Sequence, residues 1–128
     1  MTTIFAILIA GIVSTSIGFL WYHPKTFGTA WMRYSGLTPE KATNSMWMAM
    51  VGFLASLVMA SILYLQTFAE ANLARAMLHA AWLWLGFMVP ILLGPVLWER
   101  KSFWLFAINA TYWLTAILGM TIVLQIIS

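Results

Sequence analysis

The stretch Thr3–Tyr22 reads TIFAILIAGIVSTSIGFLWY and carries no charged residue. A helix needs about 20 consecutive apolar residues to cross a hydrocarbon core roughly 30 Å thick, and this stretch has that length. Three further apolar runs follow at about residues 42–68, 72–98 and 102–127. The sequence therefore predicts an all-α polytopic membrane protein, with four transmembrane helices in an antiparallel bundle that form a single membrane domain over residues 1–128.

The composition supports a membrane environment. Hydrophobic residues make up 63% of the chain and charged residues only 7%, whereas a soluble domain carries about 25% charged residues. The net charge of +3 comes from scattered basic residues and not from the clustered basic face of a nucleic-acid-binding protein. We therefore expect the lipid bilayer as a partner and no nucleic acid.

The positions of the basic residues predict the orientation. Because the spans alternate in direction, the segment 23–41 and the turn after residue 98 lie on the same side of the membrane. That side carries most of the basic residues, namely Lys25, Arg33, Lys41, Arg100 and Lys101. The other side has only Arg75, so the positive-inside rule predicts a cytoplasmic loop at 23–41 and non-cytoplasmic N- and C-termini.

Small residues recur on one face of each of the first two spans. They are Ala6, Ala10, Ser14 and Gly18 in the first span, and Ala49, Gly52 and Ser56 in the second. Since lipid provides little hydrophobic drive between helices, small residues mark places where two backbones approach closely. We expect the two stripes to pack against each other within one bundle. The alternative is a contact between molecules, in a homo-oligomer or with other membrane protein subunits.

Three polar side chains fall within the predicted spans and are functional candidates, because burying such groups in a membrane is costly. Arg75 and His79 are one helical turn apart in the third span, and Asn109 belongs to a polar patch in the fourth. A transporter or channel could use them on a polar path. Alternatively, Arg75 reaches the outer boundary and pairs with Glu70, while the other two bond neighbouring helices or border a ligand cavity.

The sequence offers little for catalysis. It contains no Asp and no Cys, and its carboxylates are Glu40, Glu70 and Glu99 alone. No catalytic triad, phosphate-binding glycine loop or zinc-protease motif can be assembled. We therefore expect no enzyme activity, no catalytic residue, no metal site and no cofactor. His23 and His79 lie at opposite depths, so one protomer cannot hold a haem between them, although haem or ligand binding in another arrangement stays open.

The segment Trp21–Trp31 reads WYHPKTFGTAW and concentrates aromatic, turn-forming and basic residues. We predict a docking surface here for a partner or for lipid headgroups, formed by Trp21, Tyr22, Pro24, Lys25, Phe27, Gly28 and Trp31. Gly28 would let the backbone bend so that Phe27 and Trp31 enter the interface together, and Lys25 would meet an anionic headgroup. The alternative is that these aromatics only anchor helix ends.

The same segment resembles the W-Y-x-P-x-x-F-G-x-x-W signature of a family of small bacterial membrane proteins, catalogued as domain of unknown function 1761. The stretches Leu97–Lys101 and Ile108–Tyr112 are similar to the family's pattern as well. The resemblance extends over essentially the whole chain. It implies four helices in a bacterial cytoplasmic (inner) membrane and brings no activity with it.

Taken together, these features favour a non-enzymatic accessory or scaffold subunit that acts through helix–helix, lipid and partner contacts. The small-residue stripes and the high aromatic content favour this hypothesis. One alternative is a small oligomeric transporter or channel that uses Arg75, His79 and Asn109. Another is a membrane protein that binds haem or a different ligand.

The orientation can be tested by cysteine labelling, because the chain has no native cysteine. We expect Ser35→Cys to be protected from a membrane-impermeant thiol reagent in intact cells, and Thr2→Cys and Ser128→Cys to be accessible from the non-cytoplasmic side. Labelling of Ser35→Cys with protection of the two terminal positions would reverse the assignment.

Overall fold

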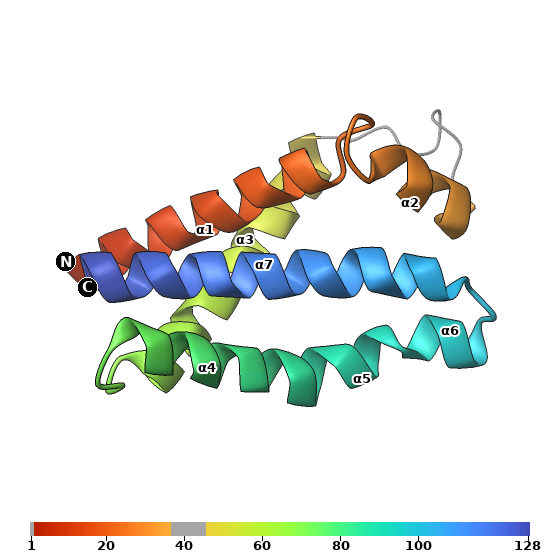
Figure 1. Cartoon of the computed structure of the whole chain (residues 1–128). Helices are drawn as coiled ribbons and strands as arrows, with labels where there is room; N and C mark the ends of the chain where they lie inside the picture. The colour runs from red at the N-terminus through yellow and green to blue at the C-terminus, as the bar shows by residue number, and fades with distance from the viewer. Residues whose placement is uncertain (1, 37–45) are drawn as a thin grey trace.

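The computed structural model describes residues 2–36 and 46–128, and that part of the chain is helical and contains no strand. Four helical segments are long and apolar enough to cross a membrane: Thr2–Trp21, Met46–Thr67, Leu73–Trp98 and Phe103–Ile127. They run in alternating directions, and both termini lie at the same end of the bundle (Figure 1). The prediction of an all-α membrane protein with four spans is confirmed.

Three of the spans are single helices, α1 (Thr2–Trp21), α3 (Met46–Thr67) and α7 (Phe103–Ile127). Apart from the start of α3, their observed ends lie within about one residue of the predicted ones. Ser102 explains the start of α7, because its hydroxyl oxygen accepts the backbone N–H of Trp104 at 3.1 Å. The predicted start of the second span at about residue 42 and the basic residue Lys41 lie outside the described residues.

The third span differs from the single helix that we predicted over 72–98. It consists of α4 (Leu73–Leu83), a π-helical turn η1 (Trp84–Met88), α5 (Val89–Leu92) and α6 (Gly94–Trp98). Asn72 caps its start by accepting the N–H of Arg75 at 2.9 Å. Prolines at positions 90 and 95 lack the N–H that a continuous helix would use. The π-helical turn η1, which lies just before the first proline, therefore interrupts the α-helical hydrogen-bond pattern.

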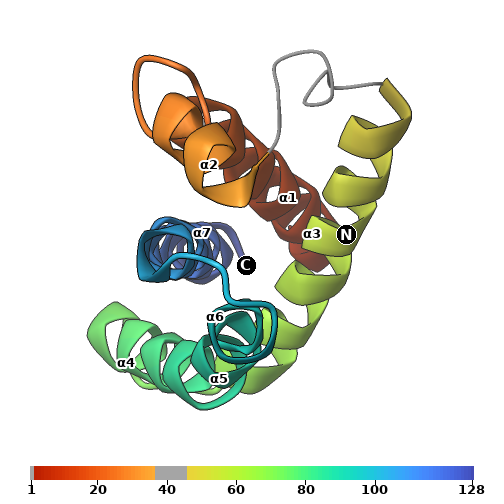
Figure 2. The ribbon, with the colours of Figure 1, turned by 90° about the vertical axis from the view of Figure 1, so that its right-hand side faces the viewer.

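The segment 23–41, predicted as a loop, also contains a helix. This is α2 (Gly28–Ser35), which lies across the end of the bundle opposite the termini (Figure 2). It ends at Gly36, whose φ of +80° is a left-handed conformation that glycine adopts at little cost. We call this end the basic end, because its described residues include Lys25, Arg33, Arg100 and Lys101.

Helix α7 occupies the middle of the bundle and contacts α1, α3 and α4. The best-buried side chains lie toward the termini, where Met120 and Leu124 of α7 pack against Ala6, Ala60 and Ala80. Alanines at these places let the neighbouring backbones approach α7 closely. The tightly packed core is therefore in the half of the bundle that holds the termini.

The small-residue stripes meet only in part. Ser14 is fully buried, and its Oγ accepts a hydrogen bond from Ser56 Oγ at 3.2 Å. Closer to the basic end, Gly18 packs against Tyr112 of α7, and Gly52 of α3 faces open space. Figure 2 shows α3 leaning away from α1 at this end. The expectation that Ala49 and Gly52 pack against the first span is therefore wrong, because Tyr112 takes the place beside Gly18.

The packed part of the stripe can be tested by enlarging one side chain. We expect Ser14→Leu to lower stability by about 1–3 kcal/mol, because overpacking a buried site forces its neighbours apart. Ile12→Leu is the matched control, since Ile12 is half exposed to the surroundings of the bundle. The comparison is made by thermal unfolding in detergent, and equal midpoints for the two variants would contradict a packed stripe at Ser14.

Candidate functional site

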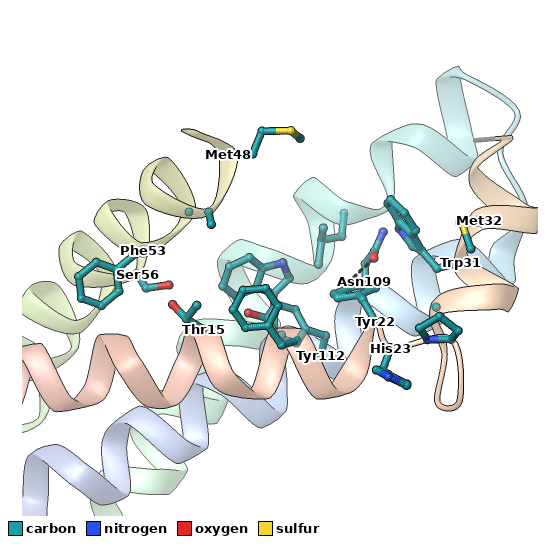
Figure 3. Close-up of a pocket in the computed structure, with 18 residues that line it drawn as sticks. Thr15, Tyr22, His23, Trp31, Met32, Met48, Phe53, Ser56, Asn109 and Tyr112 are labelled. Carbon is teal, nitrogen blue, oxygen red and sulfur yellow. Dashed lines mark hydrogen bonds between the residues drawn. The ribbon is translucent and has the colours of Figure 1, made fainter. Parts of the chain in front are cut away.

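A half-open pocket of about 830 Å³ lies between α1, α3 and α7 in the half of the bundle near the basic end (Figure 3). It begins where the contact between Ser14 and Ser56 ends. From there α3 diverges from α1, and Ala49 and Gly52 line the side of the pocket that belongs to α3. The pocket therefore results from the angle between two transmembrane helices.

The polar end of the pocket is built around Tyr22 and Asn109. Tyr22 follows α1 directly, and its hydroxyl donates to Asn109 Oδ1 on α7 at 2.6 Å. Burial raises the pKa of Tyr22 above its ordinary value, and the nearby Tyr112 raises it further. The phenol, which is protonated at neutral pH like any tyrosine, can donate in this bond.

Tyr112 forms the wall between the polar end and α1. Its ring meets that of Tyr22 edge-on, with the centroids 5.3 Å apart, and its hydroxyl donates to the backbone carbonyl of Ser14 at 3.2 Å. Gly18 leaves room for this ring, because a Cβ there would lie 3.1 Å from the Tyr112 hydroxyl. The pair of tyrosines therefore ties α1 to α7 on one side of the pocket.

The aromatic residues predicted as a docking surface make contacts within the protein. Trp21 donates its indole N–H to the Ile108 carbonyl at 3.1 Å, and its ring stacks at a tilt on Phe27 at 4.9 Å. Trp31 packs edge-on against Tyr22 at 5.5 Å. Phe27 and Trp31 thus pack on different rings within the protein, and their joint entry into the membrane interface stays a prediction. Pro24 and Lys25 of the same set are exposed.

Gly28 allows the segment to fold back on the end of α1. Its N–H donates to the His23 carbonyl at 3.0 Å, and a Cβ at this position would collide with the carbonyl oxygen of Tyr22. Gly28, Pro24 and Trp31 all border the pocket. The close backbone approach at Gly28 therefore positions the aromatic side of the pocket.

The three polar residues predicted within the spans occupy two separate places. Glu70 lies 2.9 Å from His79 Nδ1 and 3.7 Å from Arg75 Nε, at the end of the bundle that holds the termini. These residues border a second cavity of about 230 Å³. Asn109 belongs to the larger pocket near the basic end. The structure does not join the three in one polar path.

Sequence reasoning pointed to Asn109 and to its aromatic neighbours but missed the wall that faces them. The missed lining residues are Thr15, Phe19, Met32, Met48, Phe53 and Leu92. The spacing of residues along the sequence did not predict these lining residues. Spacing shows which residues share a helix face, but it does not show how far away the neighbouring helix lies.

The fold and this pocket define the class of protein, a multi-pass integral membrane protein with a cavity between its transmembrane helices. The family model described as protein of unknown function (DUF1761) matches residues 5–125, and the chain belongs to this family. Comparisons with curated proteins and with solved structures gave no match.

The role of Gly28 can be tested by adding one methyl group. We expect Gly28→Ala to lower the free energy of unfolding by about 1–3 kcal/mol, because the backbone of Tyr22 must move to admit it. Gly86→Ala is the control, since a Cβ at Gly86 meets nothing within 4 Å. If thermal unfolding shows the same midpoint for both variants, the close approach at Gly28 does not matter for stability.

Proposed function

We propose that this protein is a non-enzymatic accessory subunit of the bacterial cytoplasmic membrane, which acts by binding a membrane component in the pocket between α1 and α3. The pocket is the observation that carries the proposal. In the proposed orientation its basic end faces the cytoplasm, and the termini face the other side. The pocket then lies in the cytoplasmic half of the bilayer.

The gap between α1 and α3 favours a binding role because it stays open where helices could have packed. Gly52 is exposed and a Cβ there would meet nothing within 4 Å, although small residues normally let membrane helices come into contact. Large exposed side chains flank it on α3, among them Met48 at 58% and Leu54 at 57% exposure. Such a surface suits an occupant drawn from the membrane.

The chemistry of the lining favours binding over catalysis. Its polar groups are phenols, hydroxyls, two indole N–H groups, one amide and the imidazole of His23. His23 Nδ1 accepts the backbone N–H of Lys25 at 3.1 Å in an exposed turn, so this nitrogen is already engaged in local structure. A general base needs to lie within hydrogen-bond reach of a reacting group, and this arrangement gives His23 a structural part.

The transporter alternative is less well supported by the geometry. It requires Arg75, His79 and Asn109 along one route, whereas Glu70 engages the first two near the termini and Tyr22 engages the third near the basic end. A carboxylate that contacts both Arg75 and His79 at the end of a span fits a structural role.

Filling the pocket tests the proposal. We expect Gly52→Leu to fold, because a Cβ there meets nothing within 4 Å and the longer side chain extends into the pocket, yet to lose whatever the wild-type protein holds there. Gly86→Leu is the matched control, as it makes the same change at another open position away from the pocket. The proteins are purified in mild detergent, and the mass of each assembly and its bound small molecules are measured.

The expected result is that wild type and Gly86→Leu carry a component that Gly52→Leu lacks. Identical assembly mass and identical bound molecules in all three proteins would contradict the proposal.

A further inference from the structure

Among the residues that the structure describes, no charged side chain forms a wall of the pocket. None of the described residues that line it is Asp, Glu, Lys or Arg. A charged ligand would therefore be removed from water without an opposite charge to compensate it, and the cost of that transfer is high. The lining selects for an uncharged ligand.

Most of the lining is aromatic or aliphatic, and the cavity has the size of a small-molecule site. Its aromatic members come from four elements or their flanks and are Phe19, Tyr22, Trp31, Phe53, Tyr112 and Trp113. Concave, mostly apolar cavities of about 300–1,000 Å³ with a few placed polar groups are typical ligand sites. A volume of about 830 Å³ lies within that range.

The hydrogen-bond donors on the wall indicate what the ligand must offer. The hydroxyls of Thr15, Ser56, Tyr22 and Tyr112 already donate to protein oxygens at 2.6–3.2 Å. The amide NH₂ of Asn109, by contrast, has no hydrogen-bond partner among residues 2–36 and 46–128. In that same part of the chain no buried side-chain donor is left without a partner, so this amide remains accessible.

The indole N–H groups of Trp31 and Trp113 are likewise not hydrogen-bonded to any described residue, in contrast to those of Trp21 and Trp84. Among the described residues, the uncommitted donors around the pocket are thus one amide, two indoles and the Nε2–H of His23, whose Nδ1 accepts from Lys25. A ligand that satisfies them needs acceptor oxygens, such as those of an ester or a ketone, and needs no donor or charge of its own.

The polar and apolar ends of the pocket are arranged along the membrane normal. Tyr22 and Asn109 lie near the end of α1, at the level where a span meets the headgroup region, whereas Ser56 and Phe53 lie deeper along α3 (Figure 3). A lipid presents its polar atoms and its chains in this same order. The exposed Gly52 leaves a lateral opening through which such a molecule can enter from the bilayer.

We propose that the pocket binds an uncharged, ester-bearing lipid of the surrounding bilayer, of the diacylglycerol type. A carbonyl oxygen of the lipid accepts from the Asn109 amide, and an acyl chain runs past Gly52 toward Ser56. This inference rests on the proposed function, because it names the occupant of the same pocket.

The test uses dioleoylglycerol as the probe and dioleoylphosphatidylglycerol, which has the same chains and an anionic headgroup, as the comparison lipid. Delipidated full-length protein in detergent is titrated with each lipid, and adducts are counted by native mass spectrometry. We expect one dioleoylglycerol per chain in wild type and in Gly86→Leu, and at least a tenfold loss of affinity in Gly52→Leu. We expect the binding of dioleoylphosphatidylglycerol to be the same in wild type and in Gly52→Leu.

A second variant addresses the polar end. Asn109→Leu has a similar volume but no donor, and we expect it to bind dioleoylglycerol about tenfold more weakly, the usual effect of one or two lost hydrogen bonds. Because Asn109→Leu also removes the acceptor for Tyr22, its thermal midpoint is measured in parallel. Gly52→Leu leaves that hydrogen bond intact. If Asn109→Leu does not fold, the affinity of Gly52→Leu for dioleoylglycerol alone tests whether the lipid binds in the pocket.

Absence of dioleoylglycerol adducts on wild type, or equal affinity in wild type and Gly52→Leu, overturns the lipid assignment. If Gly52→Leu changes the mass of the protein assembly while dioleoylglycerol binding is unaffected, the occupant is a protein segment and only this inference fails. If Gly52→Leu changes neither the assembly mass nor any bound molecule, the proposed function fails as well.

Discussion

The side chain of Tyr112 occupies the space beside Gly18, and the half of the protein near the basic end is arranged around that contact. The ring comes from the central helix α7, and its hydroxyl bonds the Ser14 carbonyl of α1 at 3.2 Å. The bulky ring ties α1 to α7 at this place, and α3 diverges from α1 beyond Ser56. The cavity lies in that half of the bundle, with Tyr112 in its lining.

The two halves of the bundle are therefore held together by different kinds of contact. Toward the termini, alanines of three helices pack on Met120 and Leu124 with no exposed surface. In a membrane such contacts hold helices together through close packing, because lipid supplies little hydrophobic drive. Toward the basic end, hydrogen bonds between aromatic and polar groups replace that packing, with Tyr22 to Asn109 at 2.6 Å and Trp21 to Ile108 at 3.1 Å. Directional bonds of this kind keep an open cavity in shape without filling it.

The sequence predicted the number, the type and nearly the ends of the spans, since a charge-free run of about 20 apolar residues has few other outcomes. It also singled out Asn109 and the segment Trp21–Trp31. It could not predict which helix would take the place beside Gly18, because a small residue admits an aromatic ring as readily as a second backbone. For the same reason the role of Gly52 was misjudged. The short helix α2 was missed because it is only eight residues long and weakly hydrophobic on average, although its apolar residues do recur with the helical period.

Helices α1 and α3 touch at Ser14 and Ser56 and separate one turn nearer the basic end. Paired cysteines test this arrangement most directly, because the chain has no native cysteine and a disulfide forms only where two Cβ atoms come within about 4.5 Å. Under mild oxidation, the double variant Ser14→Cys/Ser56→Cys should cross-link rapidly, whereas Gly18→Cys/Gly52→Cys should stay reduced. Equal cross-linking of both pairs would show that the helices remain in contact along their length and would contradict the account.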